Sequence, residues 1–191
     1  MLVKYSKEGF AAFLSHRETM RALEMALRRN DIPLAFSEGF NPRPRMSFSP
    51  ALPLGVAAEG EYLEVAVEAE VEVAPAMESI NRALPQGLRV REMQLLGTTM
   101  PRLSRWTRYG LYRVKGEGEE SYVLLSLSGK GQGRLKDALE AMGTRLRGPG
   151  GGAEVTRVGL YASREEVYED ARGTVYYYEP GKRELEKMVG D

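Results

Sequence analysis

The stretch Glu61-Tyr62-Leu63-Glu64-Val65-Ala66-Val67-Glu68 contains the clearest structural signal in the chain. Leu63, Val65 and Val67 alternate along it with residues that are mostly polar or small. Because successive side chains of a β-strand point to opposite faces, this alternation predicts a strand with one buried face. Glu64 and Glu68 are expected on the solvent face.

Further elements are predicted on both sides of this strand. On the C-terminal side, Pro75–Leu84 has apolar residues at helical spacing, and Leu88–Leu96 is typical of another strand. On the N-terminal side, Leu34–Phe36 and Met46–Phe48 are strand-like and lie before and after a proline-rich loop.

A helix is predicted to begin after Ser15. The run Ser15-His16-Arg17-Glu18 fits a capping box, in which Ser15 is the N-cap and Glu18 reaches back to it. The residues that follow divide into an apolar face and a polar face. The apolar face consists of Met20, Leu23 and Leu27, and the polar face of Arg17, Arg21, Glu24 and Arg28. A solvated helix surface and a row of phosphate contacts both fit the polar face.

Together with a strand at Met1–Ser6, these elements have the order strand, helix, strand, strand, helix, strand. This is the order of the ferredoxin-like βαββαβ unit. We therefore predict an α+β protein with a ferredoxin-like domain over residues 1–97, a linker over 98–107 and a second small α+β domain over 108–191. The second domain is expected to contain strands at Tyr109–Lys115, Tyr122–Ser128, Val155–Tyr161 and Thr174–Glu179, and helices at Arg134–Met142 and from Lys182.

The net charge of the chain is zero, but the charges are segregated along the sequence. Residues 57–78 carry seven glutamates and no basic residue, which we interpret as solvation and charge balance. Residues 82–115 carry eight lysines and arginines against one glutamate. A neutral protein with this distribution can still present a basic face to an anionic partner.

The chain contains no cysteine and a single histidine, His16. The absence of thiols excludes disulfides, cysteine-ligated zinc, a thiol nucleophile and an iron–sulfur cluster held by this chain. His16 is a candidate general base in the first turn of its helix, with a structural role as the alternative. No apolar segment resembles a signal peptide or a membrane span, so we expect a cytoplasmic protein without a membrane partner.

The most distinctive loop is Ser37–Phe48. Pro42 and Pro44 fix their own backbone φ and push the preceding residues toward extended geometry. Arg43 and Arg45 are therefore held on a stiff backbone, and guanidinium groups bind phosphate or carboxylate in a bidentate manner. A contact loop for an anion or nucleic acid and a solvated surface connection both fit this pattern.

A second mixture of aromatic and basic residues lies around the predicted linker. Trp106 has three arginines close to it in the sequence, Arg102, Arg105 and Arg108. An RNA-facing linker and a wedge between the two domains are both consistent with this composition.

Several segments of the chain resemble the radical-SAM-linked protein family, an uncharacterised bacterial domain found beside or fused to a radical SAM protein with a cobalamin-type domain. The resemblance is densest over residues 11–68. Its segments are Phe13-Leu14-Ser15-His16, Met20-Arg21-Ala22-Leu23, Leu27-Arg28-Arg29, the run from Ile32 to Pro44, Met46-Ser47-Phe48, Leu52-Pro53-Leu54-Gly55 and Gly60-Glu61-Tyr62-Leu63-Glu64. The chain departs from the family at Arg17-Glu18, where Leu-Asp is common.

The resemblance implies a radical SAM protein as the partner. That partner is expected to hold the iron–sulfur cluster and S-adenosylmethionine, while the presence of cobalamin stays open; no cofactor is expected in this chain. Members of the family often lie near genes for ribosomal proteins and ribonucleases. The resemblance therefore implies RNA, either ribosomal or transfer RNA, as the substrate class.

Three functions are consistent with these observations. The first is an RNA-binding or substrate-presenting subunit of a radical SAM system that modifies RNA. Its contacts are predicted to be Arg17, Arg21, Arg28, Arg43 and Arg45 on phosphates, together with Asn41 and a base stacked on Phe40 or Phe48. The second is a metal-independent RNA-processing enzyme that uses His16, and the third is a protein–protein adaptor for the radical SAM partner.

Overall fold

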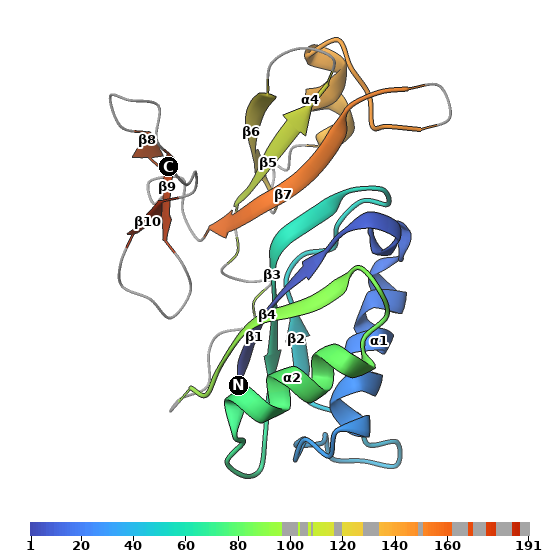
Figure 1. The fold of residues 1–191 in the computed structure, drawn as a ribbon, viewed down its shortest axis with the longest axis vertical. Coiled ribbons are helices and arrows are strands. Elements are labelled where there is room, and N and C mark those ends of the chain that lie inside the picture. The colour runs from blue at the N-terminus through green and yellow to red at the C-terminus, as the bar shows by residue number, and fades with distance from the viewer. Residues whose placement is uncertain are drawn as a thin grey trace. The chain divides into compact units, whose positions relative to one another are not determined.

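The computed structural model describes residues 1–96, 103, 107, 109–116, 120–127, 134–148 and 151–161, and the backbone of 168–169, 175–178 and 185–187. The chain forms two compact units, Met1–Ser104 (unit 1) and Arg105–Asp191 (unit 2) (Figure 1). Both units combine helices with antiparallel strands, so the predicted α+β class is confirmed. The predicted domain and linker boundaries stay predictions.

Unit 1 is built on an antiparallel sheet with the strands β1 (Leu2–Lys7), β2 (Met46–Phe48), β3 (Ala57–Val65) and β4 (Leu88–Gln94). β3 lies between β1 and β2, because Leu63 pairs with Val3 on one side and with Phe48 on the other. β4 pairs with the other side of β1. The strand order within unit 1 is therefore β4-β1-β3-β2.

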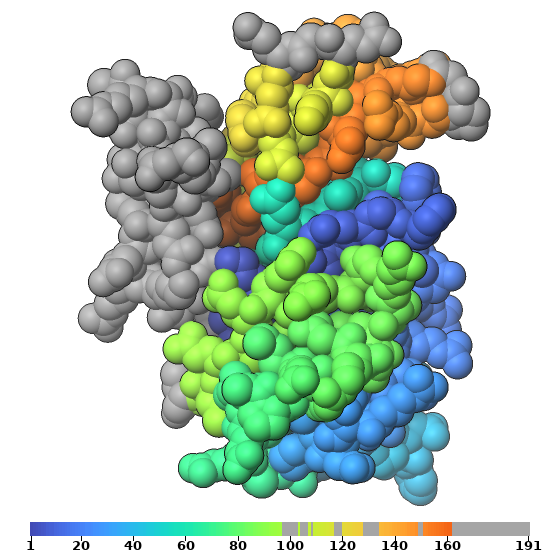
Figure 2. All heavy atoms as spheres, viewed as in Figure 1, coloured from blue at the N-terminus to red at the C-terminus, as the bar shows by residue number. Residues whose placement is uncertain are grey.

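Two helices, α1 (His16–Arg29) and α2 (Val73–Ala83), cover one face of this sheet and enclose the core of unit 1 (Figure 1). Leu23 and Leu27 of α1 and Ile80 of α2 are almost completely buried there. Burial of a side chain of this size contributes roughly 1.5–3 kcal/mol, so packing holds the helices on the sheet. The outer side of α2 and the segment after it form part of the molecular surface in Figure 2.

The start of α1 confirms the predicted capping box. The Glu18 N–H donates to the Ser15 hydroxyl oxygen (3.2 Å), and the Ser15 N–H donates to the Glu18 carboxylate (2.8 Å). These two bonds satisfy two of the backbone donors that a helix leaves free at its N-terminus. Hydrogen bonds from the side chain and then the backbone of Ser15 hold the pKa of Glu18 below its ordinary value.

Replacing Ser15→Ala is expected to lower the free energy of unfolding by about 1 kcal/mol at neutral pH, because it removes the N-cap acceptor. The lowered pKa of Glu18 means that its carboxylate stabilises the fold above its unfolded-state pKa. This contribution is lost as the pH falls through the folded-state pKa of Glu18. The difference in the free energy of unfolding between Ser15→Ala and the wild type should therefore become smaller at acidic pH. Urea unfolding at several pH values measures it, with Ser79→Ala inside α2 as the control. A pH-independent difference would contradict the role of Glu18.

Two predicted strands differ from the structure. Leu34–Phe36 is no regular strand, because its residues form only isolated bridges, from Leu34 to Val67 and from Phe36 to Pro44. β3 begins at Ala57, four residues before the predicted start. The small residues at its beginning show no alternation between polar and apolar types, so the pattern could not reveal this part of the strand.

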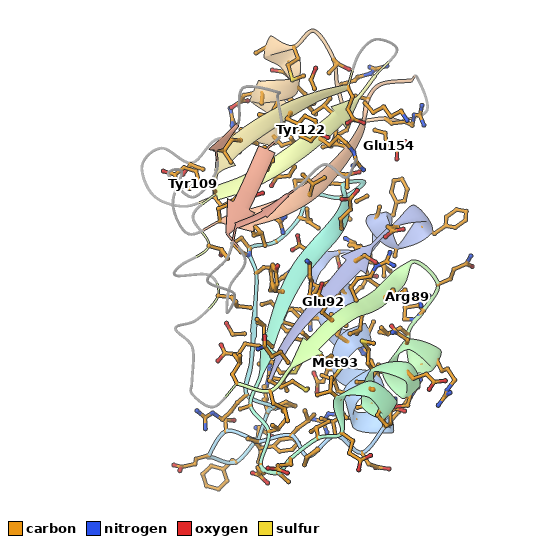
Figure 3. All side chains as sticks on the ribbon, turned by 60° about the vertical axis from the view of Figure 1, so that its left-hand side comes forward. Arg89, Glu92, Met93, Tyr109, Tyr122 and Glu154 are labelled. Atoms are coloured by element: carbon orange, nitrogen blue, oxygen red, sulfur yellow. The ribbon has the colours of Figure 1, made fainter. Side chains whose placement is uncertain are left out.

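Unit 2 contains the strands β5 (Tyr109–Lys115), β6 (Glu120–Ser126) and β7 (Glu154–Tyr161) and the helix α4 (Leu135–Ala141). β5 pairs antiparallel with β6 on one side and with β7 on the other. Figure 3 shows Tyr109 on β5, Tyr122 on β6 and Glu154 on β7. These elements confirm the strands and the helix that the sequence predicts between residues 109 and 161.

The C-terminal part of unit 2 forms a separate sheet of β8 (Tyr168–Glu169), β9 (Val175–Tyr178) and β10 (Leu185–Lys187). The helix predicted from Lys182 is wrong for residues 185–187, whose backbone pairs with β9. Helix-favouring residues in this segment are a weak prior, which strand pairing overrides. None of the helices in the described ranges has the length and apolar character needed to cross a membrane.

Candidate nucleic-acid interface

The proline- and arginine-rich loop folds back on itself as a hairpin, defined here as residues 35–45 and called the arginine hairpin. The Ser37 N–H donates to the Arg43 carbonyl oxygen (2.8 Å). The Arg45 N–H donates to the Ala35 carbonyl oxygen (2.8 Å). The two arms of the loop are therefore joined by backbone hydrogen bonds rather than left open.

Two local features stabilise the turn of the arginine hairpin. The same two residues form a second hydrogen bond, in which the Arg43 N–H donates to the Ser37 hydroxyl oxygen (3.1 Å). Gly39 has a φ of +117°, which L-residues with a side chain rarely adopt. The turn thus depends on a glycine and on a serine whose side chain bonds across the loop.

The base of the arginine hairpin is attached to the extension of β3. The Ala35 N–H donates to the Ala66 carbonyl oxygen (2.9 Å), and the Ala66 N–H donates to the Arg45 carbonyl oxygen (3.0 Å). Leu34 also forms a bridge with Val67. Because its conformation is fixed before any ligand arrives, the hairpin loses little entropy on binding.

The tip and one arm of the arginine hairpin carry the predicted contact residues in exposed positions. Phe40 is fully exposed at the tip, and Asn41 is exposed beside it. Arg43 and Arg45 are exposed on the second arm. Within the part of the chain that the structure describes, neither guanidinium group has a hydrogen-bond or ion-pair partner.

The two sides of the hairpin differ in character. Phe36 and Pro44 form a bridge pair, so their side chains share one side. Arg43 and Arg45, the neighbours of Pro44, are directed to the opposite side by the alternation of extended backbone. The structure therefore presents an aromatic side, a basic side and an aromatic tip.

The aromatic side of the hairpin contacts the C-terminal end of α1. The guanidinium carbon of Arg28 lies 5.2 Å from the centre of the Phe36 ring, in a cation–π contact. Arg28 also forms the predicted i, i+4 pair with Glu24, at 2.9 Å between Nε and Oε1. The structure thus brings one predicted α1 arginine to the hairpin.

Phe36 was missed by the sequence analysis, which placed it in a strand. The signal that identifies it is the spacing of Phe36, Gly39 and Pro44, in which a glycine stands between two extended arms. That spacing is typical of a hairpin and brings the ring close to Pro44. The contact with Arg28 requires the packed structure.

The predicted arginines of α1 lie on one exposed face of the helix. At 3.6 residues per turn, Arg17, Arg21 and Arg28 fall within about 40° of one another around the helix axis. The row extends about 16 Å from Arg17 to Arg28, at 1.5 Å per residue. Among the described residues, Arg17 and Arg21 have no ion-pair or hydrogen-bond partner. The row therefore continues the basic surface from the hairpin toward the start of α1.

His16 and Phe48 are close to each other and away from the hairpin tip. Their ring centres are 6.0 Å apart with the planes at 82°, an edge-to-face arrangement. Both rings are half-buried, and Phe48 packs against the core of unit 1. Of the two phenylalanines proposed for base stacking, Phe40 is therefore the exposed one.

A buried polar cluster lies near this contact. Glu61 is only 2% exposed, and its carboxylate accepts a hydrogen bond from the Ser49 hydroxyl (2.7 Å). The Tyr62 N–H donates to the same hydroxyl (3.3 Å). The interpretation of every glutamate in residues 57–78 as a solvated charge is thus wrong for Glu61, because a partner twelve residues earlier satisfies it inside the protein.

Two further points concern the linker residues and groups of metal-ligating side chains. Trp106, Arg102, Arg105 and Arg108 lie outside the described residues. Over the ranges that the structure does describe, no group of three or more histidine, aspartate and glutamate side chains is arranged to hold a metal ion.

Residues 1–145 match a family described as an uncharacterised protein conserved in bacteria (DUF2344). The chain belongs to this family. The DUF2344 match includes the arginine hairpin, the α1 row, the buried polar cluster and the elements of unit 2 through α4. Neither a curated protein nor a solved structure matched the chain. The match gives no link to radical SAM proteins, so that partnership stays a prediction.

Proposed function

We propose that this protein binds RNA and presents it to a radical SAM protein that modifies it. The observation that carries the proposal is the arginine hairpin, which exposes an aromatic ring at its tip and, on one arm, two arginines without an ion-pair partner among the described residues. Proteins bind unpaired nucleotides with positively charged side chains and exposed aromatic rings, and a rigid backbone holds these groups in place.

Each part of the surface has a distinct task in this proposal. Arg43 and Arg45 bind phosphates through their guanidinium groups. Phe40 stacks on an unpaired base, and the neighbouring Asn41 amide bonds to a base edge. The α1 row, with Arg28 held against Phe36, contacts the backbone that leads away from the hairpin.

The radical SAM partner enters the proposal through the sequence resemblance. Because the chain has no cysteine, the iron–sulfur cluster and the S-adenosylmethionine bound to it belong to the partner. Ribosomal or transfer RNA is the proposed substrate. In this division of labour the chain selects the RNA and the partner performs the chemistry.

We also propose that unit 1 belongs to the ferredoxin-like folds. Its element order is strand, helix, strand, strand, helix, strand, and its strand order is β4-β1-β3-β2 with antiparallel pairs. Both helices lie on one face, which leaves the hairpin as an insertion between α1 and β2. These features support the assignment.

Crosslinking in cells tests RNA binding directly. The tagged full chain is crosslinked to RNA by ultraviolet light, recovered under denaturing conditions, and the attached RNA is sequenced. We expect one or a few RNAs to be enriched, and the enrichment to fall when Arg43 and Arg45 are both changed to alanine. If the wild-type protein recovers no RNA above background, the proposal is wrong.

A further inference from the structure

A group of exposed apolar side chains lies at the end of unit 1 where α1 begins. Phe10 is 88% exposed and Phe13 is 65% exposed, both on the 3₁₀ helix η1 (Gly9–Phe13). Leu54 is 60% exposed on the turn before β3. These three residues are called the η1 patch below. Monomeric proteins rarely expose large apolar groups side by side without a binding role.

The geometry of η1 places the two rings together. A 3₁₀ helix has three residues per turn, so residues 10 and 13 lie on the same side. Ala11 and Ala12 occupy the other sides and are buried. The sequence therefore presents two phenylalanines outward and two alanines inward. A Cβ at Gly55 would lie 3.6 Å from the Phe13 ring, so the Leu54 turn adjoins the same surface.

The η1 patch is held in place by hydrogen bonds on three sides. The Glu8 N–H donates to the Gly87 carbonyl oxygen (2.8 Å), and the Gly55 N–H donates to the Ala12 carbonyl oxygen (3.0 Å). The ammonium group of Lys7, a buried residue, donates to the Leu14 carbonyl oxygen (2.6 Å). A partner therefore meets a preformed surface, and little entropy is lost in ordering it.

The charged residues that line a pocket next to η1 are one ion pair and one further arginine. Glu8 is neutralised by Arg91, at 2.6 Å between Oε1 and a guanidinium nitrogen. Arg89, at the start of β4 (Figure 3), has no side-chain partner among the described residues. A pocket of about 380 Å³ that includes Glu8, Arg89 and Arg91 lies beside η1. An incoming carboxylate fits this border.

We propose that the η1 patch is a docking surface for a protein whose contact region has apolar side chains bordered by carboxylates. The inference rests on the proposed function in one respect, which is that the protein partner is the radical SAM protein. The RNA and the protein partner then bind at opposite ends of α1, with the arginine hairpin at one end and η1 at the other.

RNA is the less suitable occupant of this surface. Leu54 has no ring on which a base can stack. The N-terminus of α1, which otherwise attracts phosphate, is already occupied by the Glu18 carboxylate in the capping box. The apolar patch with a basic border thus favours a protein over a nucleic acid.

Binding of a purified radical SAM protein from the same source as this chain tests the proposal. The full-length chain is immobilised, and affinity is measured by biolayer interferometry for the wild type and for Phe10→Asp with Phe13→Asp. We expect at least a 30-fold loss, because buried aromatic residues dominate binding at such surfaces (about 30-fold per strong contact). Met25→Asp, an exposed apolar residue of α1, is the matched control and should retain wild-type affinity.

The outcomes separate the patch from the proposed function. Wild-type affinity in the double variant would show that the η1 patch is not the docking surface, while leaving the partnership intact. No binding by the wild-type chain would overturn the partnership, and the patch with it, even where RNA crosslinking succeeds. A wild-type dimer that the double variant dissolves would identify a second copy of the chain as the occupant. Loss of crosslinked RNA in the double variant would assign the patch to RNA instead.

Two further variants protect the test against misfolding and examine the charged border. Leu54→Asp lies outside η1 and should weaken binding even if the double variant fails to fold. Arg89→Glu should weaken binding at low salt, because charges at the border of an interface mainly affect the association rate. The difference in affinity from the wild type should disappear at high salt, which screens these charges. An Arg89→Glu effect that is independent of salt would contradict the assigned role.

Discussion

Changing Arg43→Ala together with Arg45→Ala is expected to weaken RNA binding about 25-fold in roughly 0.1 M salt. For single strands, each lost phosphate contact reduces the salt dependence of log K by about 0.7. Two lost contacts therefore make the slope of log K against log salt shallower by about 1.4. Over the decade between 1 M and 0.1 M salt this corresponds to about 25-fold. Fluorescence anisotropy with an RNA recovered by crosslinking measures both quantities.

The matched control removes the same charge elsewhere. Arg82 and Arg147 are exposed arginines that pair with Glu78 and Glu154 outside the proposed interface. Changing both to alanine alters the net charge as much as the test variant does. If the control weakens binding equally, the effect is due to overall charge, and the assignment of the arginine hairpin fails. The hairpin variant should unfold at the wild-type temperature, since Arg43 and Arg45 are exposed and their guanidinium groups have no hydrogen-bond or ion-pair partner among the described residues.

The parts of the fold that the sequence predicted correctly depend on neighbouring residues. The capping box joins Ser15 and Glu18, three residues apart, and its two hydrogen bonds depend only on this spacing. The Glu24–Arg28 pair follows from one helical turn. β5 was predicted with its observed bounds, Tyr109–Lys115. Local physical rules are sufficient in these cases.

The errors come from pairing between segments that are not adjacent in the sequence. Glu61 lies on the same face of the alternating pattern as Leu63 and Val65, but its charge led to the prediction that it is solvated like the other glutamates of residues 57–78. Its burial depends on Ser49, which reaches it only after β2 and β3 have paired. The helix predicted from Lys182 failed for the same reason, because the neighbouring strand β9 decides the conformation of residues 185–187.

The candidate interfaces show the same division. The sequence identified Arg43, Arg45 and Phe40, because proline, glycine and arginine mark an exposed and stiff loop. It did not identify Phe36, whose value lies in its contact with Arg28 on α1. It also did not identify the η1 patch, because two phenylalanines three residues apart are too short a pattern to show whether they are buried or exposed. The exposed fractions of Phe10 and Phe13 reveal it.

Gly87→Ala is expected to destabilise unit 1 by about 3 kcal/mol. Gly87 has a φ of +90°, and backbone strain of this kind costs about 1–3 kcal/mol for a residue with a side chain. A Cβ there would also overlap the Glu8 carbonyl oxygen and lie 2.9 Å from the Ala11 Cβ. The hydrogen bond from Glu8 to Gly87 must then break, at a further cost of about 1 kcal/mol. Urea unfolding followed by circular dichroism measures the total.

Two controls separate strain from overlap. Gly9 also has a positive φ, of +54°, but open space surrounds its Cβ position, so Gly9→Ala should cost only about 1–2 kcal/mol. Gly116 has open space and no positive φ, so Gly116→Ala should be close to neutral. Equal effects of Gly87→Ala and Gly9→Ala would show that η1 yields without cost. If η1 is instead fixed by Gly87, the variant should also weaken partner binding at the η1 patch. RNA binding at the arginine hairpin, beyond the other end of α1, should remain while the protein is folded.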